Sequence, residues 1–240
     1  NEAALKLARK YTGKTNILAF QHSFHGRTYG AMSMTGNPHI QAGYAPLVPG
    51  ISFAPYNDEA ALAQITPDLA AVILEVVQGE GGVYAGEQAW LQHVNAKCQA
   101  TGVLLIIDEV QTGIGRTGYR MAYEGYGLDP DIYTVAKGLA NGIPVGAMVG
   151  RKQFASAFGP GSHGSTFAGN ALAMAAANSV LTQLTPELLT EVRDHAATLW
   201  QALETQVAPL PAVKQLTGKG LMVGIHLDEQ LPVSQVITQL

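Results

Sequence analysis

Asp108 and Lys137 each stand at the end of a strand-like run, Val103–Ile107 and Asp131–Ala136. An aspartate at the end of a strand buried on both faces is costly unless a cation or a hydrogen-bond donor meets it. A lysine that is desolvated at such a place becomes a better nucleophile toward an aldehyde. Taken alone, each has a simpler explanation, Asp108 as a cap of the next turn and Lys137 as a solvated surface residue. Together they form the pair that pyridoxal phosphate (PLP) requires, a lysine that makes an imine and a carboxylate for the pyridinium nitrogen.

The spacing of this pair favours a shared location. Lys137 follows Asp108 by 29 residues, about one strand–helix–strand step, so both side chains can face one crevice. Ligands of such sheets bind beyond the carboxyl ends of the strands. The same rule selects four segments that follow apolar runs, namely Gln21–Arg27, Glu75–Gly82, Asp108–Gln111 and Lys137–Gly138.

The elements that must position these residues alternate between strand and helix patterns. Near-continuous apolar runs separated by helices indicate an α/β fold with a parallel or mixed sheet that is buried on both faces. The predicted strands are Asn16–Phe20, Leu69–Val77, Val103–Asp108, Asp131–Ala136 and Val145–Gly150. The predicted helices of this part are Asn1–Tyr11, Glu87–Ala100 and Asn170–Leu184.

The pattern changes after Pro186. Glu187–Val207 predicts one long amphipathic helix, prolines then interrupt the chain, and Val213–Leu227 predicts two short strands. We therefore expect a large domain over residues 1–185 and the start of a smaller α+β domain over residues 186–240. Helix patterns run up to both termini, and the first residue is not methionine, so we expect that material is missing at both ends.

Composition restricts the class of function. Of 240 residues, 47% are hydrophobic and 13% are charged, which is typical of a globular protein rather than a disordered one. The net charge of −4, without runs of like charge, argues against nucleic acid or an anionic membrane as the main partner and favours small molecules. No apolar run approaches the roughly 18 residues of a membrane span. A single cysteine, Cys98, fits a reducing compartment, which we expect to be the cytoplasm, and makes neither a disulfide nor a zinc cluster within the chain.

One motif points to a different cofactor. Gly113–Gly118 matches the dinucleotide fingerprint G-x-G-x-x-G. The fingerprint should open a helix directly after a strand, but four residues intervene here and two more glycines follow. We therefore disfavour a nicotinamide oxidoreductase. A noncatalytic binding protein that kept the fold is a further alternative, against which the intact Asp108, Gln111 and Lys137 argue.

Seven separate blocks, which run through essentially the whole chain, carry a family resemblance. They are Asn1–Arg9 (NEAALKLAR), Phe24–Thr28 (FHGRT), Gly36–Gly50, Glu75–Gly82 (EVVQGEGG), Asp108–Gly118 (DEVQTGIGRTG), Ala136–Gly146 and His163–Asn170 (HGSTFAGN). The sequence resembles the class III aminotransferases, which are PLP-dependent enzymes of fold type I. The resemblance implies a mostly parallel, seven-stranded type of central sheet with helices on both faces, and a smaller α+β domain at the C-terminal end.

The resemblance also implies residue roles toward the cofactor. Lys137 would form the imine and later shuttle the proton, and Asp108 would pair with the pyridinium nitrogen. Gln111 would bind the phenolic oxygen of the ring, and Phe24 would stack on the ring. Thr166 would contact the cofactor phosphate from the neighbouring subunit, which implies a homodimer with shared active sites.

Four further residues match substrate-binding positions of the family. Arg27 would grip the α-carboxylate of the substrate, which suits the two parallel donors of a guanidinium. Ser165 would contact substrate from the neighbouring subunit. Glu75 and Glu80 lie in the block where the family keeps carboxylates near the cofactor and the substrate-binding arginine.

The activity implied by the resemblance is a transamination in arginine biosynthesis. The δ-amino group of N2-acetylornithine would pass to 2-oxoglutarate, giving N-acetylglutamate 5-semialdehyde and glutamate. Ornithine, succinylornithine and 4-aminobutyrate are alternative donors within the class. The chain departs from the family in two ways. The family's phosphate loop would precede Asn1 and its small-domain arginine would follow Leu240, so both lie outside this chain. Within the chain, Asn141 and Ala168 stand where related sequences often have glycine.

Overall fold

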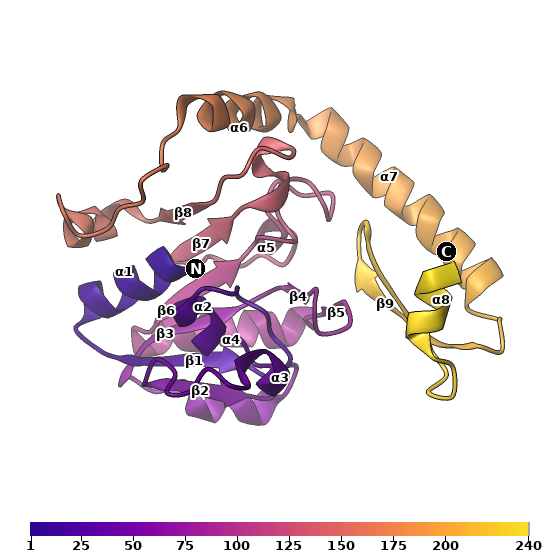
Figure 1. Ribbon diagram of the computed structural model, residues 1–240, viewed down its shortest axis with the longest axis horizontal. Helices are drawn as coiled ribbons and strands as arrows, with labels where there is room; N and C mark the ends of the chain where they lie inside the picture. The colour runs from indigo at the N-terminus through magenta and orange to yellow at the C-terminus, as the bar shows by residue number, and fades with distance from the viewer. Residues whose placement is uncertain (240) are drawn as a thin grey trace.

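A six-stranded sheet forms the centre of the computed structural model, which describes residues 1–239 (Figure 1). The first five strands in the order below are parallel, and the last is antiparallel to its neighbour. The α/β class and the mostly parallel sheet are thereby confirmed. The order is β2 (Ile51–Ala54), β1 (Asn16–Phe20), β3 (Leu69–Leu74), β6 (Leu104–Asp108), β7 (Ile132–Val135) and β8 (Ala147–Gly150).

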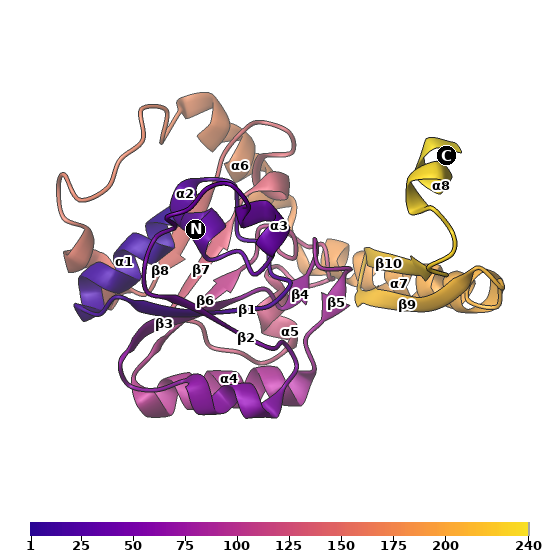
Figure 2. The same cartoon turned by 60° about the horizontal axis from the view of Figure 1, so that its bottom comes forward.

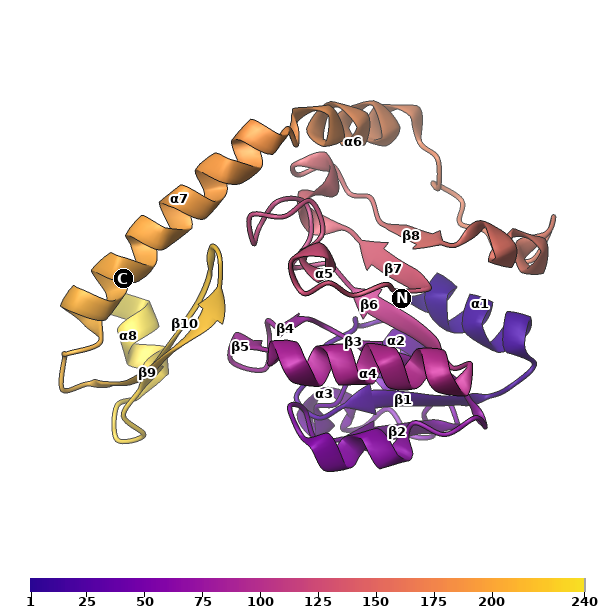
Figure 3. The same ribbon diagram turned by 180° about the vertical axis from the view of Figure 1, so that it is seen from behind.

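Helices cover both faces of this sheet, as Figure 2 shows. Leu18 and Phe20 of β1 belong to the core under helix α4 (Gln88–Thr101). The alternate residues Ile17 and Ala19 belong to the core under helix α1 (Glu2–Thr12). Seen from behind, α4 lies across its face of the sheet (Figure 3). Because successive strand residues point to opposite faces, two apolar layers explain why the strands are almost continuously apolar.

The strand predicted over Leu69–Val77 is divided in the structure. β3 ends at Leu74, and β4 (Val77–Gln78) pairs with β5 (Tyr84–Ala85) in a small antiparallel hairpin. The backbone carbonyl of Glu75 accepts a hydrogen bond from the Tyr56 hydroxyl at 2.7 Å. The chain therefore leaves the sheet at Glu75, and the hairpin follows directly on the carboxyl end of β3.

Several short elements lack a pattern long enough to predict. They are α2 (Tyr29–Ser33), α3 (Pro38–Gln41), α5 (Ala122–Gly125), strand β2 and the 3₁₀ turns η1 (Glu59–Gln64), η2 (Lys137–Ala140) and η3 (Lys152–Phe158).

The C-terminal part runs away from the sheet. Helix α6 (Ala171–Gln183) is capped by the Asn170 side chain, and α7 (Pro186–Ala202) by Thr185. A π-helical turn, η4 (Leu203–Val207), ends α7. The hairpin β9 (Val213–Lys219) and β10 (Met222–Leu227) follows, and then α8 (Val233–Gln239) (Figure 1). No described helix has the length and apolarity to cross a membrane.

Candidate active site

The carboxyl ends of three adjacent strands gather the acidic and basic residues that the sequence selected. Leu74 and Ile107 are register partners on β3 and β6, so Glu75 and Asp108 follow side by side. Asp108 pairs with Thr134 of β7, and Lys137 opens η2 three residues later. Burial and the Asp108 charge raise the pKa of Glu75 well above its ordinary value, whereas the Lys137 charge lowers it. The structure thus brings Glu75, Asp108 and Lys137 into one electrostatic neighbourhood.

Asp108 is only 3% exposed, and most of its hydrogen-bonding capacity is used. Oδ2 accepts from Asn1 Nδ2 at 2.7 Å and lies 2.9 Å from His25 Nδ1. Oδ1 accepts from the Val110 backbone N–H at 3.0 Å. A carboxylate offers about four acceptor positions. Three are occupied within the chain, and the position that remains is on Oδ1.

The partners of Asp108 are themselves fixed from several elements. Asn1 Nδ2 also donates to the His25 carbonyl at 2.6 Å, and Thr134 donates its hydroxyl to Asn1 Oδ1 at 2.8 Å. The His25 backbone N–H donates to Thr35 Oγ1 at 3.0 Å. Sequence reasoning did not select Asn1, His25 or Thr134, although Asn1 and His25 lie inside the blocks that carry the family resemblance.

Glu109, next to Asp108, has a structural role instead. It is fully buried and accepts hydrogen bonds from the Thr112 hydroxyl at 2.5 Å and the Tyr123 backbone N–H at 2.8 Å. Burial raises its pKa, and these two hydrogen bonds oppose the rise. Glu109 therefore ties the loop after β6 to Tyr123, while Asp108 itself caps the following turn through the Val110 N–H.

The loop after β1 places Phe24 and Arg27 next to each other. The Phe24 backbone N–H donates to Glu75 Oε2 at 3.2 Å, which ties the loop to the end of β3. The Arg27 guanidinium carbon lies 5.6 Å from the centroid of the half-buried Phe24 ring. Arg27 is exposed, and within residues 1–239 no carboxylate forms an ion pair with it. Its guanidinium is available to an anionic ligand.

Gln111 and Glu80 meet across the site. Gln111 Nε2 donates to Glu80 Oε1 at 3.4 Å, and the Glu80 side chain is exposed. A Cβ at Gly79 would collide with the side-chain amide of Gln111, which would then have to leave this position. The EVVQGEGG block therefore positions the Gln111 amide as well as its own carboxylates.

We expected Lys137 to be desolvated, and this expectation is wrong for the structure. It is exposed, because Leu139 and Ala140 are the residues of η2 that turn into the protein. Its φ of +43° lies in the left-handed region, which is rare for a residue with a side chain and is found preferentially at functional sites.

Ser165 and Thr166 lie on the exposed loop between η3 and α6. Within residues 1–239, no side-chain hydrogen bond links either of them to the strand-end residues. His163 and Ala168 of the same loop do line a pocket of about 440 Å³ that also touches Asn1 and His25. That both hydroxyls serve a neighbouring subunit stays a prediction.

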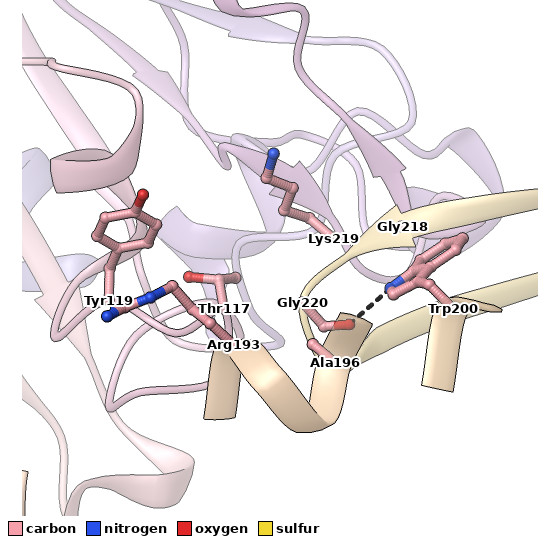
Figure 4. A pocket seen from close by; sticks show the side chains of 8 residues that line it. All are labelled: Thr117, Tyr119, Arg193, Ala196, Trp200, Gly218, Lys219 and Gly220. Atoms are coloured by element: carbon pink, nitrogen blue, oxygen red, sulfur yellow. Dashed lines mark hydrogen bonds between the residues drawn. The ribbon is translucent and has the colours of Figure 1, made fainter. Parts of the chain in front are cut away.

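A separate hollow of about 410 Å³ lies between the loop after β6, helix α7 and the β9–β10 hairpin (Figure 4). Arg193 Nη1 donates to the Gly118 carbonyl at 2.5 Å, and the Trp200 indole donates to the Gly220 carbonyl at 2.8 Å. None of the residues predicted for catalysis or binding lines it. Gly113–Gly118 itself forms consecutive turns and opens no helix. Among the described residues, no cluster of three acidic, histidine or cysteine side chains could hold a metal ion.

A family comparison decides the assignment. The model of the family "Aminotransferase class-III" matches residues 1–240, the whole chain. The chain belongs to the class III aminotransferases. This agrees with the family indicated by the seven sequence blocks.

Two curated relatives of this class III chain carry the same name. It is 85% identical over 240 residues to an acetylornithine aminotransferase of Lactiplantibacillus plantarum. It is 53% identical over 243 residues to the acetylornithine aminotransferase of Bacillus subtilis. In both cases the match covers all of this chain but 62% of the relative, so the chain spans about three fifths of the length of these proteins.

Solved structures of the same family share the fold. An ornithine aminotransferase of Toxoplasma gondii, whose active site holds PLP at partial occupancy, has a TM-score of 0.89 at 32% identity. The match covers 95% of this class III chain and 57% of the other. An (S)-enantioselective omega-transaminase of Thermomicrobium roseum has a TM-score of 0.87 at 31% identity, with 98% and 61% covered. The type I transaminase fold is thereby confirmed.

Proposed function

We propose that the protein is a PLP-dependent aminotransferase that moves the δ-amino group of N2-acetylornithine to 2-oxoglutarate. The products are N-acetylglutamate 5-semialdehyde and glutamate, as in arginine biosynthesis. The observation that carries the reaction class is the buried Asp108, with one acceptor position left, at the strand end next to that of Lys137. The choice of donor is supported by the 85% identity to an acetylornithine aminotransferase.

The residues present fit PLP. When bound, PLP supplies an aldehyde for the amino group and a ring that accepts electrons from the substrate carbon. Asp108 Oδ1 would accept, at its free position, a hydrogen bond from the protonated ring nitrogen, and the Phe24 ring would cover the pyridine. Gln111 Nε2 would donate to the phenolic oxygen, and Thr166 of a second copy would donate to the phosphate.

Lys137 has two successive tasks in this proposal. Its amine, Nζ, would hold the cofactor through the aldehyde carbon, and the same atom would take a proton from the substrate carbon and return it. The exposed position of Lys137 suits both tasks, since Nζ must move between the aldehyde and the substrate.

Substrate binding is assigned to Arg27, Ser165, Glu80 and Glu75. Arg27 would hold a carboxylate with two parallel N–H donors. Ser165 would contribute a hydroxyl from a second copy, and Glu80 an exposed carboxylate beside Gln111. Glu75 is 3% exposed and accepts from the Phe24 N–H, so we propose that it supports substrate and cofactor binding by fixing Phe24.

We propose a homodimer, because the hydroxyls of Ser165 and Thr166 lie on an exposed loop with no partner among the strand-end residues. We propose that residues 186–240 begin a second, smaller domain, in line with the departure of α7 from the sheet (Figure 3). We propose a cytoplasmic location, which the single buried cysteine supports.

The test is a donor comparison in the full-length protein. N-acetylornithine, ornithine, succinylornithine and 4-aminobutyrate are assayed side by side with 2-oxoglutarate, and kcat/KM is compared. We expect N-acetylornithine to give the highest value, together with a visible absorbance band from bound cofactor. A clear preference for another donor would correct the substrate, and absence of both PLP binding and transamination would overturn the reaction class.

A further inference from the structure

His25 forms the most deeply buried ion-pair contact of the site. Its side chain is 0% exposed and that of Asp108 is 4% exposed, with Nδ1 2.9 Å from Oδ2. Because a carboxylate oxygen only accepts, the proton of this contact belongs to His25 Nδ1. The other ring nitrogen, Nε2, is buried and has no hydrogen-bond partner in the described part of the chain. All polar contacts of the ring are therefore directed at Asp108.

The surroundings hold this ring in one place. The His25 backbone N–H is bound by Thr35 Oγ1, and its carbonyl is bound by Asn1 Nδ2. Thr35 in turn donates its hydroxyl to the Ala31 carbonyl at 3.1 Å. A backbone fixed on both sides leaves the imidazole little freedom, so it can orient the carboxylate rather than follow it.

The arrangement decides which oxygen of Asp108 is free. His25 and Asn1 occupy both acceptor positions of Oδ2, while Val110 occupies one of Oδ1. Without the imidazole, an acceptor position would open on Oδ2, and the carboxylate would be held by one donor on each oxygen. Its orientation and its open position would then be less well defined.

We propose that His25 is a positioning residue for the reaction. Through Nδ1–H it saturates Asp108 Oδ2, so that the open acceptor position on Oδ1 is the one presented to the ring nitrogen of PLP. This inference rests on the proposed function, because it assumes that Asp108 meets that nitrogen.

The chain contains a matched control. His93 Nδ1 lies 2.8 Å from Glu59 Oε1, but these side chains are 58% and 59% exposed. The two contacts share residue types and distance, and they differ in burial and in their position relative to the strand ends. His93→Asn therefore measures what loss of an ordinary surface contact does.

The experiment compares His25→Asn, His25→Gln, His25→Leu and His93→Asn in the full-length protein. In His25→Asn the side-chain amide nitrogen can take the place of Nδ1 and donate to Asp108. In His25→Gln the amide nitrogen reaches the place of Nε2 instead, and in His25→Leu no donor remains. The measurements are the PLP dissociation constant, the pH profile of the visible absorbance of bound cofactor, kcat and KM separately, and the Tm.

We expect His25→Asn to keep kcat within about threefold of the unmodified protein and to keep its pH profile. His25→Leu should lower kcat about 10- to 100-fold, the loss that corresponds to one charge-assisted hydrogen bond, with KM for 2-oxoglutarate nearly unchanged. It should also shift the absorbance profile and weaken PLP binding. His93→Asn should change none of these.

Two results would overturn the inference. One is a His25→Leu protein with unchanged kcat, pH profile and PLP affinity, which would show that Asp108 is held without His25. The other is a His25→Asn protein no better than His25→Gln, a comparison that remains decisive if the leucine variant fails to fold. If the unmodified protein neither binds PLP nor transaminates, the proposed function itself is wrong, which is a distinguishable outcome.

Discussion

Acidic residues lie at both ends of the central strands, but in opposite environments. At the amino end of β7, Asp129 and Asp131 pair with Arg151 at 2.7 and 3.4 Å, and the Arg151 side chain is 40% exposed. At the carboxyl ends, Glu75 and Asp108 are each 3% exposed, and neither forms an ion pair with a lysine or arginine of the described chain. The first set is satisfied within the chain, whereas Asp108 is held in place with an acceptor position left open. The difference separates carboxylates that are paired for structure from one that is kept for a ligand.

Among variants that test the difference between the two ends of the strands, we expect the largest loss of kcat at Lys137. Lys137→Ala should lower kcat by at least about 1,000-fold, because one atom acts as both nucleophile and proton carrier. Steady-state assays of the full-length protein measure this, with the exposed Lys97→Ala on α4 as the control. Near-normal turnover in the Lys137 variant would remove this residue from the mechanism.

Asp108→Asn should come next, with kcat about 100-fold lower while some PLP remains bound. A neutral amide cannot stabilise a positive ring nitrogen as a carboxylate does. Cofactor titration and single-turnover rates separate binding from proton transfer. The matched change Asp129→Asn at the amino end should alter the rate less than twofold, and equal effects of the two variants would abolish the distinction between the two ends.

Arg27→Lys should raise KM for the donor and for 2-oxoglutarate about tenfold with the visible absorbance of bound cofactor preserved. A point-like ammonium does not replace the planar pair of donors that grips a carboxylate. KM values for both substrates are compared with those of Arg116→Lys, another exposed arginine. Unchanged KM values would return Arg27 to the class of solvated surface residues.

The raised pKa of Glu75 predicts a pH-dependent effect on stability. The folded protein binds the Glu75 proton more tightly than the unfolded chain, so the free energy of unfolding falls as the pH rises from about 4.5 toward the raised value. Glu75→Gln lacks this titration and retains a carbonyl for the Phe24 N–H. Its stability relative to the unmodified protein should therefore grow in urea unfolding as the pH rises above about 4.5. A constant difference, such as we expect for the exposed Glu191→Gln, would contradict the assignment.

The smallest effect is expected at the amino end. Arg151→Ala should lower the free energy of unfolding by about 1 kcal/mol or less, since exposed ion pairs contribute little and are screened by salt. Transamination should be unaffected. A large loss of activity in this variant would show that the amino end also shapes the site.

Sequence reasoning predicted the elements whose signal is local. The strand at Asn16–Phe20 follows from an apolar run, and α6 (Ala171–Gln183) lies within the helix predicted over Asn170–Leu184. Strand β2 was missed, because its four residues alternate too briefly to stand out. The break at Glu75 was missed as well, since the apolar run continues through it and the contact of its carbonyl with the Tyr56 hydroxyl is not encoded by any local pattern.

The site was predictable only to the level of residue types. Asp108 and Lys137 could be paired because both follow apolar runs on successive strands. The contacts of Asp108 could not be predicted, because the fold brings Asp108 to His25 across 83 positions of sequence and to Asn1 across 107 positions. The exposure of Lys137 also depends on which residues of η2 face inward.

The two outermost strands of the sheet limit its growth. β2 and β8 have four residues each, and within residues 1–239 no strand pairs with their outer edges. Pro55 follows β2 directly, and Pro144 precedes β8 by three positions. Because proline has no backbone N–H to donate, it limits the extension of β2 at its C-terminal end and of β8 at its N-terminal end. Short edges bounded by proline present few unpaired backbone groups to another chain. Within residues 1–239, these two edges are therefore poor templates for the edge-to-edge addition of another strand.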